Sequence, residues 1–189
     1  QTGISLGIGE AFTINASYIL SQRAPNASEL FSDGLHHSIA AIEYGNLSLQ
    51  KELSHKILAS FIKQGDEFTF SIDPFISKII DYIFIEPTKL EQTIRGAFPV
   101  WEYKATDAFF SGIDFNSSID IAEQLKFNLG LSYTYAQDLS NDKPIILIPP
   151  FNSFQSLKFT PKNQKWNFEI VHHINGKQNR IPNSNFPVS

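Results

Sequence analysis

Alternation of apolar and polar residues with a period of two is the feature that most limits how this chain can fold. It is clearest from Gln124 to Tyr135, where apolar or aromatic residues occupy every second position. Successive side chains of an extended chain point to opposite faces, so the pattern predicts a β-strand with one apolar face. About 9–11 tilted strand residues cross the hydrocarbon core of a bilayer. The segment therefore indicates one strand of a membrane β-barrel.

The same pattern recurs along the chain and predicts eight antiparallel strands. Their expected ranges are 3–10, 12–22, 52–63, 67–85, 100–116, 124–135, 152–160 and 165–176. No run of about 18 apolar residues interrupts them, so no transmembrane helix is expected.

The links between these strands alternate in length. The shorter links are residue 11 and segments 64–66, 117–123 and 161–164, whereas the long links are 23–51, 86–99 and 136–151. Outer-membrane barrels have short turns at one end and long, outward-facing loops at the other. We therefore expect an all-β, antiparallel transmembrane barrel, followed by an irregular polar segment from 177 to 189.

Composition excludes several other classes of protein. The net charge of −4 argues against a nucleic-acid-binding surface, which is usually basic. The absence of cysteine excludes disulfides and thiolate metal sites. The 17 phenylalanines are more than a soluble chain of 189 residues readily buries, but lipid-facing strands can expose them. No nucleophile elbow, zinc-protease motif or glycine-rich phosphate loop occurs, so neither an enzyme nor a bound cofactor is expected.

Two other architectures remain open on these grounds. One is a complete eight-stranded outer-membrane barrel with a structural or adhesive role, because eight strands close a small barrel. The other is a soluble β-sandwich that binds carbohydrate. Long loops on one side only argue against the sandwich, whose hairpin loops usually have about 2–5 residues.

Two motifs flank the first long link. Residues 22–31, Gln-Arg-Ala-Pro-Asn-Ala-Ser-Glu-Leu-Phe, resemble the Arg-Ala-Pro…Glu-Leu box of TonB-dependent receptors. Residues 45–52, Gly-Asn-Leu-Ser-Leu-Gln-Lys-Glu, resemble the Gly-Asn-Pro-x-Leu-x-x-Glu box that follows it in the family. The sequence departs from these boxes at Gln22, where an aromatic residue is usual, and at Leu47, where proline is usual. Within the first motif, Asn26 and Glu29 have the spacing of a capping box and predict a helical turn over 26–31.

Later segments extend the resemblance over nearly the whole chain. Residues 81–84, and residues 103–108 followed by 112–114, resemble barrel strands of the family. Ile-Pro-Pro at 148–150 resembles the end of a late extracellular loop. Eight strands are far fewer than the roughly 22 of such receptors. Residues 1–189 are therefore expected to be part of the C-terminal barrel domain, without the plug domain and the final strands.

The resemblance also implies a function. Receptors of this kind lie in the outer membrane of Gram-negative bacteria, in contact with its lipid, and import scarce nutrients such as ferric siderophores, haem or metal complexes. An N-terminal plug contacts an inner-membrane energy-coupling protein. The expected partners are thus lipid, the coupling protein and a small-molecule or metal-chelate ligand, but not nucleic acid.

His36 and His37 are the candidate ligand-binding residues of the first long link. The resemblance places an extracellular haem-ligating histidine in this interval. Two imidazoles could also help to hold zinc or another transition metal, with Asp33 and Glu43 as oxygen ligands. The alternative is a solvated polar loop, because adjacent side chains of an extended chain point in opposite directions.

Other charged residues are weaker candidates. Arg23 and Arg95, together with Lys51, lie where they would attract an anionic iron chelate. His172 is expected to face lipid and His173 the lumen, both as structural residues. The remaining lumen-facing charges, expected to pair with neighbouring strands or water, are Lys126, Glu169 and Asp114.

Overall fold

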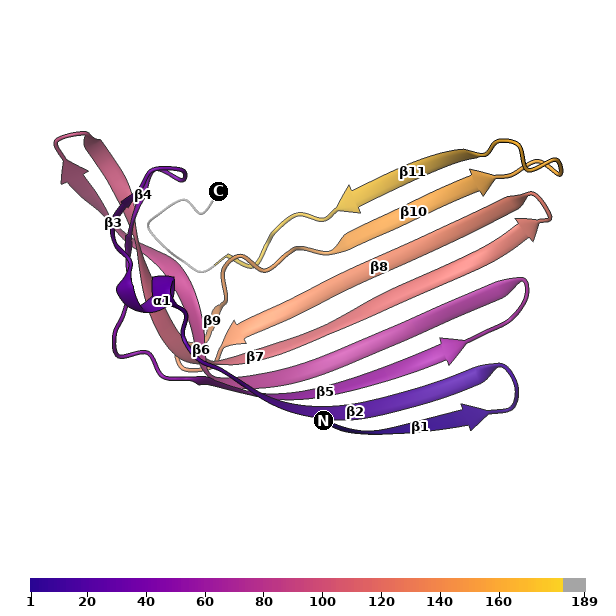
Figure 1. Ribbon diagram of the computed structural model, residues 1–189, viewed down its shortest axis with the longest axis horizontal. Coiled ribbons are helices and arrows are strands. Elements are labelled where there is room, and N and C mark those ends of the chain that lie inside the picture. Colours follow the sequence, from indigo (N-terminus) through magenta and orange to yellow (C-terminus); the bar gives the residue numbers. More distant parts are fainter. Residues whose placement is uncertain (182–189) are drawn as a thin grey trace.

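All eight predicted strands lie side by side in one curved antiparallel sheet in the computed structural model, which describes residues 1–181 (Figure 1). In spatial order they are β1 (Thr2–Ile8), β2 (Phe12–Arg23), β5 (Glu52–Lys63), β6 (Phe68–Thr93), β7 (Gly96–Ala122), β8 (Leu125–Asp138), β10 (Asn152–Phe159) and β11 (Phe168–Asn175). We call them the wall strands. Their short links meet at one end of the sheet, the turn end, and the long links at the other, the loop end (Figure 1).

Four short elements lie in the long links. The helix α1 (Ala27–Phe31) and the strands β3 (Asp33–His36) and β4 (Ala41–Tyr44) belong to the first link. The two-residue strand β9 (Lys143–Pro144) belongs to the link after β8 and pairs with it. The segment after β11 is irregular as far as it is described, and residues 182–189 of the predicted irregular segment lie outside the described residues.

Strand register collects the alternating apolar residues on one face of the sheet. One cross-strand row reads Leu6, Ile14, Phe61, Ile72, Phe115 and Leu131, and continues through Ser153 to Ile174. The apolar side chains of this face are not covered by a second layer of structure. Ile4, Ile57 and Ile170, for example, are 71%, 50% and 56% exposed. An exposed apolar face of this length is the lipid-facing surface of a membrane barrel.

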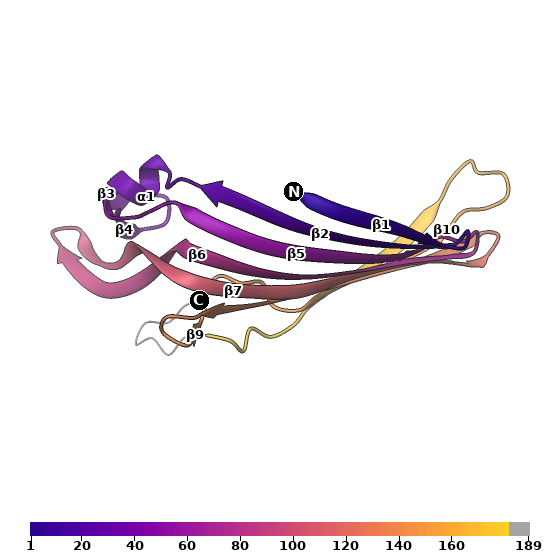
Figure 2. The same cartoon turned by 90° about the horizontal axis from the view of Figure 1, so that it is seen from below.

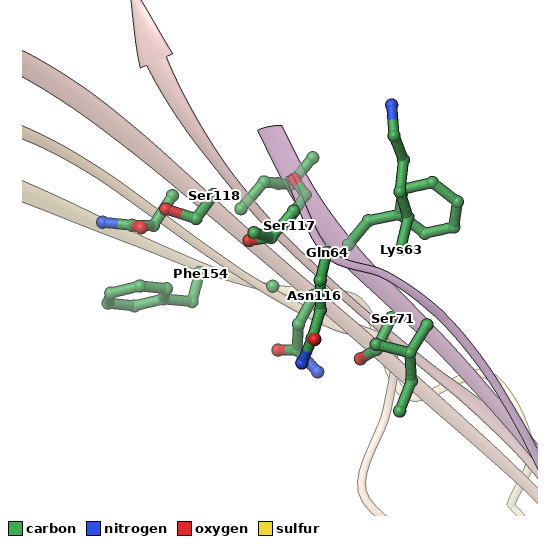
Figure 3. Close-up of a pocket in the computed structure, with 13 residues that line it drawn as sticks. Lys63, Gln64, Ser71, Asn116, Ser117, Ser118 and Phe154 are labelled. Atoms are coloured by element: carbon green, nitrogen blue, oxygen red, sulfur yellow. The ribbon is translucent and has the colours of Figure 1, made fainter. Parts of the chain in front are cut away.

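The opposite face is polar and its side chains bond across strands. Asp73 accepts hydrogen bonds from Ser60 and Ser71, and Asn128 donates to Ser156 over 3.0 Å. Small residues leave this face hollowed: a depression of about 490 Å³ lies near the turn end, with Asn116 and Phe154 on one side of the sheet and Lys63 pointing away on the other (Figure 3). Polar lumen-facing side chains opposite apolar lipid-facing ones are the arrangement of transmembrane barrels.

The predicted long link 86–99 is wrong, because most of it continues the β6–β7 pair as one long hairpin that turns at Ile94 and Arg95. The pairing shifts between Ile79 and Tyr82 and again between Pro87 and Lys89. Each bulge reverses which face a side chain takes, so the period of two is broken although the chain stays extended. The short link 117–123 is likewise strand up to Ala122, which leaves a tighter turn.

Pro74 lies inside β6, although a proline within a sheet is normally found only on an edge strand or at a bulge. The β5–β6 ladder is interrupted beside it, since pairing passes from Leu58–Phe75 directly to Phe61–Ile72. Proline has no N–H to donate to that ladder. The Ser60 hydroxyl bonds to the Asp73 carboxylate across the gap instead.

The sheet is a single open layer (Figure 2). β1 and β11 are the two ends of the strand order and do not pair within residues 1–181. The structure is therefore neither the closed eight-stranded barrel nor the two-layered sandwich that the sequence left open. No helix among the described residues is both long and apolar enough to cross a membrane.

Candidate functional site

The first sequence motif forms the predicted helical turn at the loop end. Asn26 caps α1: its side-chain oxygen accepts from the Glu29 amide over 2.9 Å, and the Glu29 carboxylate accepts from the Asn26 amide over 2.8 Å. This reciprocal pair is a capping box, which fixes the direction in which the chain leaves β2.

The second motif packs directly on this turn. The Gly45 amide donates to the Ser32 carbonyl over 2.7 Å, and the Asn46 amide donates to the Glu29 carbonyl over 2.8 Å. A Cβ atom on Gly45 would lie 2.6 Å from the carbonyl carbon and oxygen of Leu30. Glycine is thus required here because two backbone segments approach too closely for any side chain.

Arg23 joins the two motifs to each other. Its Nε and Nη2 atoms donate to the Glu52 carboxylate over 2.8 Å each, and its Nη1 atom donates to Glu29 over 2.9 Å. The planar guanidinium matches the fork of a carboxylate, which makes such pairs stronger than single hydrogen bonds. Arg23, Glu29 and Glu52 form what we call the Arg23 cluster.

The Arg23 cluster also reaches the bulge in β6. Glu52 Oε1 accepts from the Ile83 amide over 2.8 Å, just beyond Asp81, whose φ of 55° marks the bulge. Burial alone would raise the pKa of Glu52, but the hydrogen bonds from Arg23 and the Ile83 amide outweigh it and hold the pKa below its usual value. A single carboxylate therefore connects both motifs to the point where the hairpin leaves the wall.

The β3–β4 hairpin of the first link adds to the outer half of the β6–β7 hairpin. β4 pairs in parallel with β7, with Ile42 beside Val100 and Tyr44 beside Glu102, above the point where β8 ends. Ala41, Ile42 and Val100 are buried in this contact. The outer half of the β6–β7 hairpin is the part beyond the bulge at Asp81, residues 82–106. Together with α1, β3 and β4 we call it the loop platform (Figures 1 and 2).

His36 lies at the end of β3 on this platform. Its Nδ1 atom is 3.2 Å from Glu43 Oε1, and its Nε2 atom is 3.3 Å from the Ser38 hydroxyl. A depression of about 310 Å³ lies beside it, lined by the side chains or backbone of Ser28, Ser32, Asp33, Gly34, Leu35, His36 and Glu43.

The other proposed donors do not join His36 in a metal cluster. His37 is exposed in the turn after β3. Across residues 1–181, no three His, Asp or Glu side chains are grouped closely enough to hold a metal ion by themselves. His36 with Glu43 is thus the pair of predicted ligands that the fold brings together.

The two arginine candidates differ in their surroundings. The Arg23 donors are engaged by two carboxylates, so this side chain holds the platform together. Arg95 is exposed at the tip of the β6–β7 hairpin, where its amide donates to the Thr93 hydroxyl over 3.1 Å. Lys51, grouped with them in the sequence, donates to Gln22 over 3.0 Å.

The histidines of β11 take opposite faces. Register places His172 with Ile170 on the apolar face, where its Nδ1 atom lies 3.0 Å from Gln155 Oε1. His173 lies on the polar face, with its ring 5.1 Å from that of Phe154.

No sequence pattern predicted the ion pairs and hydrogen bonds that hold the other segments of the loop end. Glu86 on β6 binds Lys104 over 2.8 Å and Lys143 of the third long link over 3.1 Å. Asp138, only 1% exposed, accepts from Thr106 over 2.5 Å and from the backbone and side chain of Asn141. Apart from Asn141, which is three residues from Asp138, the partners are 18 to 57 residues apart in the sequence, so no local spacing signals them.

These features coincide with a known family. A sequence model described as "TonB dependent receptor-like, beta-barrel" matches residues 3–185. The chain therefore belongs to the TonB-dependent receptor β-barrel family, and its eight wall strands are part of a larger barrel. The family comprises outer-membrane transporters of Gram-negative bacteria. A comparison with curated protein sequences gives no significant match.

Solved structures agree on the fold. The copper transporter OprC superposes with a TM-score of 0.79 at 18% identity, over 95% of this chain and 26% of that one. The siderophore receptor PirA from Pseudomonas aeruginosa gives 0.68 at 18% identity, over 92% and 32%. The hemophore receptor HasR of Serratia marcescens, solved with its hemophore HasA and haem, gives 0.68 at 16% identity, over 90% and 31%. The chain spans about a quarter to a third of these structures.

Proposed function

We propose that this protein imports a scarce metal-containing nutrient, such as a ferric siderophore, haem or another metal complex, across the outer membrane. The observation that carries the proposal is the loop platform, which the family's two motifs fix above a lipid-facing wall. Three structurally similar receptors carry copper, siderophore or haem in their names or titles. A rigid platform at the outer mouth of a barrel is suited to hold such a ligand before entry.

The rest of the transport cycle is proposed from the family. We infer that residues 1–189 belong to a barrel domain of about 22 strands whose lumen holds a plug. The plug contacts an inner-membrane coupling protein, which supplies the energy for import. The unpaired edges of β1 and β11 support this inference, because strand edges are not stable in lipid.

His36 is the residue that we assign to the cargo. Metal-ligating histidines usually have their second ring nitrogen held by a carboxylate, as Glu43 holds Nδ1 of His36. The Nε2 atom is then the one that binds a ligand, and its weak contact with the Ser38 hydroxyl is lost when it does so. One imidazole is enough for a metal that a porphyrin or chelator already holds, and His37 and Arg95 are further contacts for the same cargo.

Nutrient uptake by the full-length receptor tests the transport proposal. The receptor is expressed in a strain that lacks receptors of its own. We expect growth on one of three supplies, haem, a ferric siderophore or copper, and we expect that growth to stop when the coupling protein is deleted. Growth that is the same with and without the coupling protein would contradict energised import.

Histidine variants of the same receptor test the cargo contact. His36→Ala is expected to lower uptake at limiting cargo about tenfold, which corresponds to the loss of about 1.4 kcal/mol of binding. His172→Ala, on the apolar face of β11, is the matched control and is expected to leave uptake unchanged. Equal uptake by wild type, His36→Ala and His37→Ala at equal surface levels would refute the contact but not the import.

A further inference from the structure

The depression beside His36 is lined by acidic residues but by no lysine or arginine. Register places Glu43 directly opposite Gly34 on the β3–β4 hairpin, and Asp33 begins the same hairpin. The rest of the lining, besides His36, consists of two serines, a glycine and a leucine, which carry no charge. The Glu43 side chain is only 15% exposed, so water screens its charge incompletely. A depression of about 310 Å³ therefore has one imidazole and two carboxylates at its border.

The basic residues around this depression are neutralised by other carboxylates. Their ion pairs are Arg23 with Glu29 and Glu52, Lys104 with Glu86, and Lys89 with Glu91. Arg95 is the arginine of the loop platform that forms no ion pair within residues 1–181, and it lies at the exposed tip of the β6–β7 hairpin, outside the lining. No basic side chain is thus left to offset the acidic residues at the depression.

Asp33 and Glu43 lack such partners. Among the described residues, neither carboxylate forms an ion pair with a lysine or an arginine. Glu43 contacts His36 Nδ1 over 3.2 Å, and a neutral imidazole brings no compensating charge. The field of an unpaired carboxylate extends over about 8 Å at physiological salt. A ligand in the depression is therefore exposed to a negative potential.

We propose that the site at His36 selects metal complexes that are neutral or positively charged and discriminates against those with a net negative charge. The inference rests on the proposed contact between His36 and the cargo. No three metal-binding side chains are grouped within residues 1–181, so the metal keeps part of its own chelator and the charge of that chelator counts. Two unit charges about 4 Å apart change a binding constant about fivefold in water, and less at greater distance or in salt.

Three copper complexes test this preference on the purified, full-length receptor folded in detergent. Ethylenediamine, iminodiacetate and nitrilotriacetate give Cu²⁺ complexes that are doubly positive, neutral and singly negative, each with positions open to an imidazole. Affinities are compared with those for free imidazole, because the number of open positions differs. The binding that His36→Ala removes is the quantity compared. We expect this relative affinity to fall about threefold per unit of charge, or about 30-fold from the positive to the negative complex.

The double variant Asp33→Asn/Glu43→Gln identifies the source of the preference. Both changes keep the shape of the side chain, and the glutamine oxygen still accepts a hydrogen bond from His36. We expect the 30-fold difference to shrink to about threefold or less, while the neutral complex binds within about threefold of wild type. Asp142→Asn is the matched control, because it removes an exposed carboxylate of the third long link that does not line the depression. Heat-modified mobility on a gel checks that each variant is folded.

Four results would overturn the proposal. They are relative binding of the negative complex as tight as that of the positive one, the full difference in the double variant, an equal loss of the difference in Asp142→Asn, and binding of all three complexes that His36→Ala leaves unchanged. Import is measured separately. A receptor that imports nothing but binds the complexes in the expected order would leave this inference intact while the proposed function fails. Efficient import of a negatively charged cargo through His36 would have the opposite meaning.

Discussion

Single residues at the loop end connect segments that are distant in the sequence. Glu52 binds Arg23, which is 29 residues away, and the Ile83 amide, which is 31 residues away. Its position in the second motif is visible in the sequence, but its partners are not. The two family motifs thus pack together in one structural contact. This contact fixes the geometry of the loop platform.

Acid is expected to loosen this contact. The pKa of Glu52 is below its usual 4.5 in the folded protein, so the folded state binds fewer protons near that pH. The stabilisation is complete above about pH 4.5 to 5 and is lost as the pH falls through the lowered native pKa. Protection of the first long link from an acid protease, measured from pH 5 to 2.5 in folded receptor, checks this. Glu86 and Asp138 contribute with the same sign.

Glu52→Gln isolates the contribution of that carboxylate. We expect weaker protection at pH 5, by about 1–3 kcal/mol, because loss of the charge leaves Arg23 without its bidentate partner. The loss is kept to this size because Arg23 is 43% exposed and water partly screens its charge. The acid dependence should also become shallower. A variant with the same acid dependence as wild type would show that another carboxylate dominates.

Gly45→Ala is expected to disrupt the platform from within. The new Cβ meets the Leu30 backbone at 2.6 Å, so α1 and the second motif must separate. We expect faster proteolysis of the first long link by at least tenfold and unchanged insertion of the barrel. Gly7→Ala is the control, since nothing lies within 4 Å of a Cβ at that position. Equal proteolysis of both variants would contradict the close packing.

At the scale of elements, the parallel β4–β7 pair makes the first long link depend on the β6–β7 hairpin. β4 has only four residues, and a strand of that length has little stability of its own. Its partner, the outer half of β7, is available because β8 ends at Asp138, opposite Ala108. The hairpin therefore acts as the support on which His36 and Glu43 are held.

Truncation of the hairpin tests this dependence. Replacing residues 88–100 by a two-residue turn removes Val100, the partner of Ile42. We expect amide hydrogen exchange of residues 41–44 to accelerate by at least 100-fold, while exchange in the wall strands stays the same. A shorter truncation of residues 90–98 keeps the β4 partner and should leave this exchange unchanged. The same acceleration in both truncations would locate the support in the hairpin tip instead.

At the scale of the whole molecule, the sheet is defined by what it leaves exposed. Its apolar face is uncovered and both edge strands lack a partner within the described residues. Such a surface is compatible with lipid and with further strands, but not with water.

The isolated chain 1–189 should therefore depend on detergent. We expect it to be soluble and rich in β-structure in detergent micelles, and to aggregate when detergent is removed. Light scattering with circular dichroism before and after removal measures this. A monomeric, folded chain in detergent-free buffer would contradict the lipid-facing assignment. Asn15→Lys on the polar face, as a control, should not alter the dependence.

Much of the wall was predictable. The alternation of β2, β5 and β8 gave ranges within three residues of those observed, because one face of each strand meets lipid along its whole length. The capping box of α1 was also predictable, since both of its partners lie within four residues. The part of the β6–β7 hairpin beyond Asp81 was not predictable from the sequence. Two bulges and two prolines interrupt the period of two there.

The sequence by itself determined the eight strands of the wall up to the hairpin beyond Asp81, their apolar face and the family, because each of these is recorded in local spacing. The tertiary structure alone decided how the long links are held: Arg23 between two carboxylates, β4 on the edge of β7, and His36 beside Glu43. Most of these contacts join residues brought together by strand register and by a bulge, whose positions no local pattern encodes.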